Sequence, residues 1–180
     1  MDILVRSYTD DGYQSYPSIR LSDEEYAKSL QCFVIACADI LPINLEKKTI
    51  YLASRNIKPK KGWWWIGGRM MPHDLPKDAA ARNLKRETNL EIPQNRFKLV
   101  AVLDHRCKDR EQQPQDIGYH AMAYTFTVEL TDAETASASE NLDKDEYKQR
   151  KGLSVFNRER LVNEKVDPAI LDLYDHIFPG

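Results

Sequence analysis

The chain has 180 residues, 42% of them hydrophobic and 30% charged, which is the size and composition of one soluble globular domain. The formal net charge of −2 disfavours extended nucleic-acid binding, although a local basic patch is compatible with it. Acidic residues stand where a signal peptide needs an apolar stretch, and the longest apolar run, 32–38, is too short to cross a bilayer. Three cysteines without a Cys-x-x-Cys pair disfavour disulfides and structural zinc, so we expect a cytoplasmic protein without membrane contact.

The first third of the chain predicts an arm, a helix and three strands. Residues 1–20 are polar and rich in tyrosine, and we expect an extended arm ahead of a single domain at 21–180. A capping box begins at Ser22, with a carboxylate three residues later, and predicts a short helix to about Leu30. Apolar runs predict buried strands, the first two joined as a hairpin and the third entering a glycine pair. These strands are expected at residues 33–40, 49–54 and 63–66.

The rest of the chain continues with mixed helix and strand signals. A helix follows the glycines, with Asp74 able to cap it, Pro76 in its first turn and Asn89 as its stop. Alternation over 119–130 predicts a long half-buried strand, with His120 on its apolar face as a hydrogen-bonded core histidine. The remaining expected elements are strands at 97–103 and 153–156, a loop at 106–115, a polar stretch with helical tendency at 131–149, a brief helix capped by Asn157, and a last helix starting at Asp167 and Pro168.

The segment most informative about function is 63–92, which combines a tryptophan-rich strand, a glycine pair and a charged helix. Glycines let the backbone approach a ligand closely because no β-carbon intervenes. The segment resembles the Nudix box, G-x5-E-x7-R-E-U-x-E-E-x-G-U with U aliphatic, and keeps its spacing from Gly68 through Arg82 to Glu87. The resemblance implies a Nudix-type α+β fold, an α/β/α sandwich with a mixed sheet between helices. It also implies hydrolysis of a nucleoside diphosphate derivative.

Some box positions depart from the family pattern. Asp74, Asn83 and Arg86 replace glutamates, and Asn89 replaces a glycine. In the family these glutamates hold Mg2+ or Mn2+, which binds the diphosphate, and hard cations need several oxygen ligands. One remaining helix glutamate disfavours a multi-metal mechanism. The resemblance therefore implies a single Mg2+, or Mn2+ in its place, held by Glu87 and the Gly67 carbonyl.

Within the family the chain is most similar to the GDP-mannose mannosyl hydrolase branch, which keeps the last helix glutamate and uses one Mg2+. The resemblance covers residues 21–160 and is loose outside the box. In that branch water attacks the sugar carbon, and arginines stabilise the departing diphosphate. The resemblance to this branch therefore implies catalytic roles for Arg55, Arg69 and Glu87. It also implies that Arg55 and Arg69 bind the substrate, a nucleotide sugar such as GDP-mannose.

Further candidate site residues follow from their positions. Trp64 lies near the basic turn 58–61, where it is suited either to stacking on a nucleobase or to core packing. His105 stands at a predicted strand end, from which it can reach the cleft and bind substrate. The catalytic histidine of the branch has no counterpart in 144–151. A carboxylate with a tuned pKa can act as base instead, and the alternatives are Glu140, Asp143, Asp145 and Glu146.

Two classes of function remain open at this point. Asn83, Arg86 and the missing histidine favour a Nudix-fold protein that binds a nucleotide without cleaving it, whereas Glu87, Arg69 and the box spacing favour a hydrolase. An RNA-binding module is disfavoured by the net negative charge, so nucleic acid is not the expected partner. The expected partner is a small nucleoside diphosphate derivative. The arm at 1–20 is compatible with a homodimer.

Overall fold

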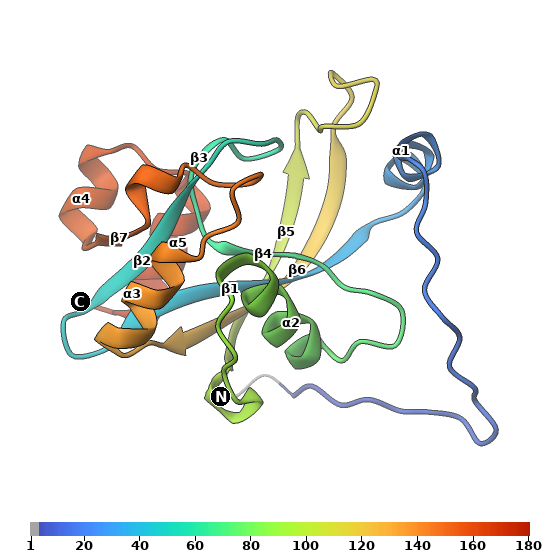
Figure 1. Cartoon of the computed structure of the whole chain (residues 1–180), viewed down its shortest axis with the longest axis horizontal. Coiled ribbons are helices and arrows are strands. Elements are labelled where there is room, and N and C mark those ends of the chain that lie inside the picture. The colour runs from blue at the N-terminus through green and yellow to red at the C-terminus, as the bar shows by residue number, and fades with distance from the viewer. Residues whose placement is uncertain (1–3) are drawn as a thin grey trace.

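The computed structural model describes residues 4–180 and has a mixed seven-stranded sheet at its centre, with helices on both faces (Figure 1). The strands are β1 Ile35–Asn44, β2 Thr49–Arg55, β3 Gly62–Trp64, β4 Ile66–Arg69, β5 Lys98–Cys107, β6 Tyr119–Glu129 and β7 Leu153–Phe156. The helices are α1 Asp23–Cys32, α2 Pro76–Thr88, α3 Asp132–Glu140, α4 Arg158–Asn163 and α5 Pro168–Ile177, with short 3-10 helices η1 Gln94–Arg96 and η2 Gln149–Lys151. This is the α+β sandwich that the sequence predicts.

The sheet has the order β3-β2-β1-β6-β5, with β4 paired to β1 and β7 paired to β2. β1 and β6 are parallel, and the other strand pairs are antiparallel. One edge of β1 is divided, because residues 37–40 pair with β4 and residues 43–44 pair with β2. The C-terminal end of β2, residues 53–55, pairs with β3, and β4 follows β3 after one residue. The box glycines in β4 therefore lie next to the first half of β1.

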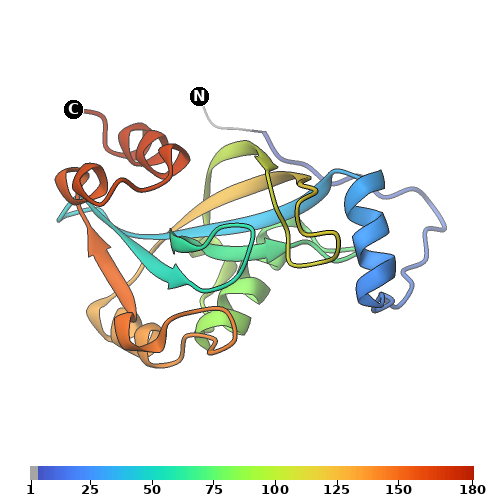
Figure 2. The same ribbon diagram turned by 90° about the horizontal axis from the view of Figure 1, so that it is seen from above.

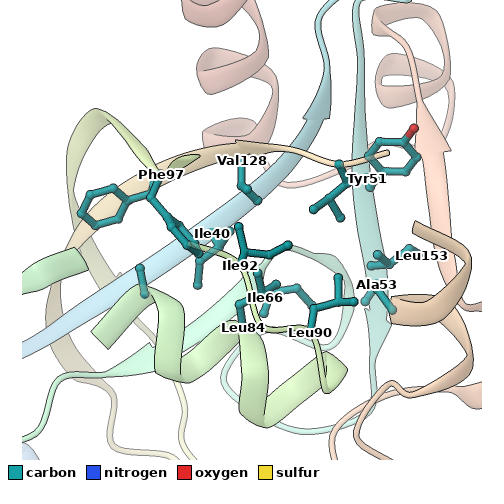
Figure 3. Close-up of a cluster of buried hydrophobic side chains, with 14 of the residues drawn as sticks. Ile40, Tyr51, Ala53, Ile66, Leu84, Leu90, Ile92, Phe97, Val128 and Leu153 are labelled. Atoms are coloured by element: carbon teal, nitrogen blue, oxygen red, sulfur yellow. The ribbon is translucent and has the colours of Figure 1, made fainter. Parts of the chain in front are cut away.

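Apolar clusters hold helices against both faces of the sheet. Figure 2 shows α2 and α3 on one side of the sheet and α4 and α5 on the other. The first cluster contains Leu84 of α2, which faces Ile40 and Ile66 of the sheet (Figure 3). The second contains Trp65, which follows β3, together with Leu161 of α4 and Ile170 of α5. Both clusters are almost fully buried, and they position the strands from which the site is built.

Residues 4–20 form an arm without helix or strand that runs along the outside of the domain (Figure 1). The first three residues of the predicted arm lie outside the described part of the chain. The arm is held at His73, because the Tyr16 ring packs edge-on against the imidazole at 4.3 Å and the Tyr13 hydroxyl is hydrogen-bonded to its Nδ1. Within residues 4–180, no helix is long and apolar enough to cross a membrane.

Local sequence signals predicted several helix ends correctly. Ser22 caps α1 in a capping box with Glu25. Asn157 and Asp167 cap α4 and α5 through their side chains. Asn89 ends α2 in the left-handed conformation. The predicted hairpin of β1 and β2 is also confirmed, as an antiparallel pair.

Several strands differ from the predicted ranges, and pairing with a partner strand explains the three larger differences. β1 continues through Pro42 to its end at Asn44, because β6 pairs with it along this stretch. β5 includes Arg106, which was expected in a loop, because Arg106 pairs with His120. The strand expected at 63–66 is divided at Trp65, because its two parts pair with different strands, β2 and β1.

The prediction that Asp74 caps α2 is wrong. The N-cap is Leu75, which makes no side-chain capping bond. The Asp74 carboxylate instead accepts a hydrogen bond from the Met71 amide at 2.7 Å and pairs with Arg82 at 2.6 Å. Asp74 therefore braces the box loop against the helix.

The prediction of His120 as a core histidine is also wrong. Its side chain is partly exposed and its Nε2 lies 3.0 Å from an Asp104 carboxylate oxygen, so it is hydrogen-bonded but outside the core. The first half of β6 buries its small residues, Ala121 and Ala123, and leaves Met122 exposed. Tyr119, Ala121 and Ala123 line the cavity described next, and His120 and Met122 lie on the opposite face of the strand.

Candidate functional site

A cavity of about 150 Å³ opens at the sheet beside the box glycines and is called the central cavity below. Strands β1 to β6 all contribute to it, together with α1 and the loop between β2 and β3. Its lining residues are Tyr26, Ile35, Cys37, Asp39, Arg55, Pro59, Lys60, Trp64, Gly67, Gly68, Arg69, His105, Cys107, Tyr119, Ala121 and Ala123.

The glycine pair brings the backbone of β4 close to β1. Gly67 lies opposite Asp39 in the sheet and has φ +156°, a conformation that side chains rarely adopt. A β-carbon at Gly67 would collide with the Asp39 carboxyl group and backbone. Only glycine therefore allows this close approach, which places the next residues, Gly68 and Arg69, at the cavity wall.

The structure brings together five of the six predicted site residues, because the central cavity is lined by Arg55, Trp64, Gly67, Arg69 and His105. They come from β2, β3, β4 and β5, so the sheet itself fixes their relative positions. Trp64 is nearly buried and presents one side to the cavity.

Two cations at the cavity have different surroundings. The Arg69 guanidinium lies over the Tyr26 ring at 4.7 Å and has no ion-pair partner in residues 4–180. Arg55 pairs with Glu146 at 2.9 Å, and its buried Nε has no hydrogen-bond partner in the described structure. Both arginines therefore retain donors that an anionic ligand can satisfy.

Lys60 was not among the predicted site residues. Its ammonium group lies 4.9 Å from the Trp64 ring centroid and 2.5 Å from Asp167. The sequence signal for it was only the basic turn 58–61. Its ion pair connects the cavity rim to the start of α5.

His105 has the features of a proton acceptor. Its Nε2 atom is buried without a hydrogen-bond partner among the described residues, and its ring packs against Trp64 and Trp65 at 5.8 and 5.9 Å. Burial, together with the nearby Lys60 charge, lowers the pKa of His105. The imidazole is therefore mainly neutral at pH 7, and its buried Nε2 has no hydrogen-bond partner among the described residues.

Asp39 is the one carboxyl group that lines the central cavity within the described chain. Its Oδ2 accepts a hydrogen bond from the Trp65 indole at 2.8 Å. Burial raises the pKa of Asp39 to about 7, and the Trp65 hydrogen bond and the Arg55 charge oppose the increase. Sequence reasoning missed Asp39. The only feature of the sequence that could have indicated Asp39 is its position as an acidic residue directly after the apolar run 32–38.

Glu87 lies in α2 and does not line the central cavity. It is fully buried, and its carboxylate accepts hydrogen bonds from the Tyr147 hydroxyl, from Arg86 and, at 3.3 Å, from the Gly67 amide. Burial raises the pKa of Glu87 to about 7, and the Arg86 charge opposes the increase. Glu87 therefore contacts the predicted site at the Gly67 amide but lies outside the central cavity.

These surroundings do not fit the divalent metal that the resemblance implies. The Glu87 carboxylate is already enclosed by protein donors. The Asn83 amide is used to bind the Ala38 and Gly68 carbonyls, and the next box position is the cation Arg86. Within residues 4–180, no group of three or more His, Cys, Asp or Glu side chains is arranged to hold a metal ion.

Of the four alternatives for the base, only Glu146 has a side chain paired to the site arginines. It accepts hydrogen bonds from Arg55 at 2.9 Å and from Arg86 at 2.7 Å. Both carboxylate oxygens of Glu146 are therefore occupied by arginine donors, and Glu146 does not line the central cavity. The remaining three, Glu140, Asp143 and Asp145, make no contact with the central cavity.

Comparison with known proteins identifies the family. Residues 35–176 match the NUDIX domain, so the chain belongs to this family. Among curated proteins no match was found.

Solved structures share the fold at low sequence identity. A MutT protein from Methanosarcina mazei Go1 is 16% identical with a TM-score of 0.57, covering 80% of this chain and 92% of that one. A MutT NUDIX hydrolase from Burkholderia pseudomallei is 18% identical with a TM-score of 0.55, covering 72% and 87%. A MutT/nudix family protein from Enterococcus faecalis is 16% identical with a TM-score of 0.48, and the 76% of this chain that aligns spans about half, 51%, of its length.

Proposed function

We propose that this protein hydrolyses a nucleoside diphosphate derivative bound at the central cavity, and that the substrate is a nucleotide sugar such as GDP-mannose. The observation that carries the proposal is the meeting of Arg55, Arg69 and His105 in one cavity beside the box glycines. Two guanidinium groups suit an anionic diphosphate, and a neutral buried imidazole suits the activation of water.

The size of the central cavity indicates which part of the substrate enters it. Pockets that bury drug-sized ligands or cofactors measure roughly 300–1,000 Å³, whereas this one measures about 150 Å³. The cavity therefore accepts one ring of the substrate, and the remainder extends outward past Arg69. The aromatic wall formed by Tyr26, Trp64 and Tyr119 suits the face of such a ring.

In the proposed reaction a water molecule attacks the anomeric carbon of the sugar. The His105 Nε2 accepts the water proton as the new C–O bond forms. The bond from the anomeric carbon to the diphosphate oxygen breaks, and its electron pair stays on the diphosphate. Arg55 and Arg69 stabilise the additional negative charge on that leaving group.

A binding protein without hydrolysis is the second candidate function. The observation that favours it is the enclosure of Glu87, the remaining helix glutamate of the box, by Tyr147, Arg86 and the Gly67 amide. In that case the cavity holds a nucleotide derivative, and no water is activated.

The test is a hydrolysis screen of nucleotide sugars and other nucleoside diphosphate derivatives with purified protein, with Mg2+ and separately with EDTA. We expect turnover of at least one nucleotide sugar, and His105→Asn to lower kcat by about 100-fold or more with a smaller effect on KM. The matched control is His120→Asn, because His120 lies outside the cavity and should leave kcat within a few fold. No turnover combined with thermal stabilisation by one nucleotide would replace hydrolysis with the binding function.

A further inference from the structure

A second cavity, of about 550 Å³, lies between the arm and the box helix. Its charged lining consists entirely of arginines, and it is called the arginine pocket below. It is lined by Ser18, Arg20, Arg69, Met71, Arg82, Asn83 and Arg86. The arm contributes Ser18 and Arg20, β4 ends in Arg69, and α2 contributes the last three residues.

The arginine pocket carries positive charge that the protein does not neutralise. Arg82 pairs with Asp74 at 2.6 Å, and Arg86 pairs with Glu87 and with Glu146. For Arg20 and Arg69, by contrast, no ion-pair partner exists in the described part of the chain. Two guanidinium charges therefore remain for a ligand.

A buried donor is also left without a partner at this pocket. The Nε atom of Arg82 is buried and makes no hydrogen bond within residues 4–180. A buried donor without a partner is energetically unfavourable, and a ligand oxygen that reached this position would satisfy it. The pocket thus has both unpaired charge and an unused donor.

The box helix presents one guanidinium group, that of Arg86, where the Nudix pattern has a carboxylate. The Arg86 Nη2 lies 3.2 Å from the place that a β-carbon on Gly68 would occupy, so this guanidinium is packed against the glycine pair. Its ion pairs with Glu87 and Glu146 hold it there. A fixed positive charge is therefore part of the protein at the box, where the resemblance implies a bound metal ion.

Arg69 lines both the central cavity and the arginine pocket. A ligand with one ring in the small central cavity would extend past Arg69 directly into the larger pocket. Guanidinium groups bind phosphate oxygens in a bidentate manner and remain charged at all physiological pH values.

We propose that the arginine pocket binds the diphosphate group of the ligand directly, with protein guanidinium groups in place of a divalent cation, and that Arg20 of the arm completes this site. The inference rests on the proposed function, because it assumes a nucleoside diphosphate derivative as the ligand. It adds that binding of the diphosphate is independent of metal and depends on the arm.

The test is calorimetric titration of the full-length protein with inorganic pyrophosphate, first in EDTA and then in Mg2+. We expect binding in EDTA at an affinity no weaker than in Mg2+. Arg20→Gln and Arg69→Gln should each weaken it by about tenfold, since each removes a charge-assisted contact. The matched control is Arg6→Gln, an exposed arm residue outside the pocket, which should leave the affinity unchanged.

Two results would overturn the inference. One is pyrophosphate binding that requires Mg2+, and the other is binding in EDTA that Arg20→Gln and Arg69→Gln leave unchanged. Melting temperatures of both variants show whether they are folded, and Arg20 is exposed, so its replacement should not affect folding. Pyrophosphate binding in EDTA without turnover of any nucleotide sugar would support this inference and contradict only the proposed hydrolysis.

Discussion

At the scale of single residues, Gly67 determines how closely the box backbone approaches β1. The position combines a φ of +156° with a lack of space for any β-carbon, because the Asp39 carboxyl group stands there. Gly62 also has a positive φ, +108°, but a β-carbon added there would meet no atom within 4 Å. A substitution at Gly62 therefore measures the cost of backbone strain alone, whereas one at Gly67 measures strain together with steric collision.

We predict that Gly67→Ala destabilises the protein more than Gly62→Ala does. Strain in such a backbone conformation costs about 1–3 kcal/mol at each position. The collision with Asp39 should add about 1–3 kcal/mol for Gly67→Ala, as overpacking does elsewhere. Urea unfolding of both variants measures the difference. Equal losses of unfolding free energy would show that β1 moves aside at no cost.

The predictability of the site also differs from residue to residue. Arg69 and Gly67 are adjacent to the box motif, so a local pattern sufficed to place them. Glu87 keeps its box position, but its burial depends on Tyr147, which belongs to a polar stretch without any apolar pattern. Arg20 reaches the site only because the arm folds back, and no local signal encodes that.

At the scale of elements, α3 shows how one residue can both cap a helix and join two segments. Thr131 and Glu134 form a capping box at its start. The Glu134 carboxylate also pairs with Arg96 of η1 at 2.6 Å. The hydrogen bonds from Arg96 lower the pKa of Glu134 to about 2, with help from Thr131.

This depressed pKa predicts a pH dependence of stability. A carboxylate whose pKa is lower in the folded state stabilises the fold above its ordinary pKa of 4.5, and this contribution is lost as the pH falls toward about 2. Glu134→Gln should therefore lower the unfolding free energy at pH 7, and the difference from wild type should shrink between pH 4.5 and pH 2. Urea titrations at several pH values provide the measurement. A difference that is constant with pH would contradict the Arg96 pairing.

Helix ends were easier to predict than strand faces. Ser22 and Asn157 bind amides three residues away, so a short pattern contains the whole interaction. The face of β6 that is buried depends on neighbours remote in sequence, and His120 lies on the outer face for that reason. The Asp74 error has a similar origin, because Arg82 lies two helical turns away and captures its carboxylate.

At the scale of the whole molecule, the arm is attached to the domain through His73 in the loop before α2. We predict that His73→Ala releases the arm, because it removes the ring that Tyr13 and Tyr16 contact. Trypsin should then cleave after Arg20 markedly faster. Tyr8→Ala is the control, since Tyr8 is 86% exposed and should leave the arm in place.

The same variant links the arm to ligand binding. If Arg20 completes the arginine pocket, His73→Ala should also weaken pyrophosphate binding in EDTA, although His73 itself does not line that pocket. Faster cleavage without any loss of affinity would show that the arm is attached at His73 but does not contribute to the pocket.

The overall topology could be predicted only through the Nudix resemblance. Individual strands follow from apolar runs, but the parallel pairing of β1 with β6 joins residues as far apart as Ile35 and Ala121. Such long-range pairing leaves no periodic signal in the sequence. Membership of the NUDIX family, shown over residues 35–176, predicts the order of the strands in the sheet, which hydrophobic patterns alone do not.

Arg69 is a wall of two cavities at once, and this has a thermodynamic consequence. Any occupant of one cavity that reorients this guanidinium changes the affinity of the other cavity for its own occupant. Linkage requires the effect to be reciprocal, so a ring and a diphosphate supplied as separate molecules should favour or oppose each other by the same factor. Measuring the affinity of each half of the ligand with and without the other half gives that factor. Its size states how strongly binding in one cavity is coupled to binding in the other.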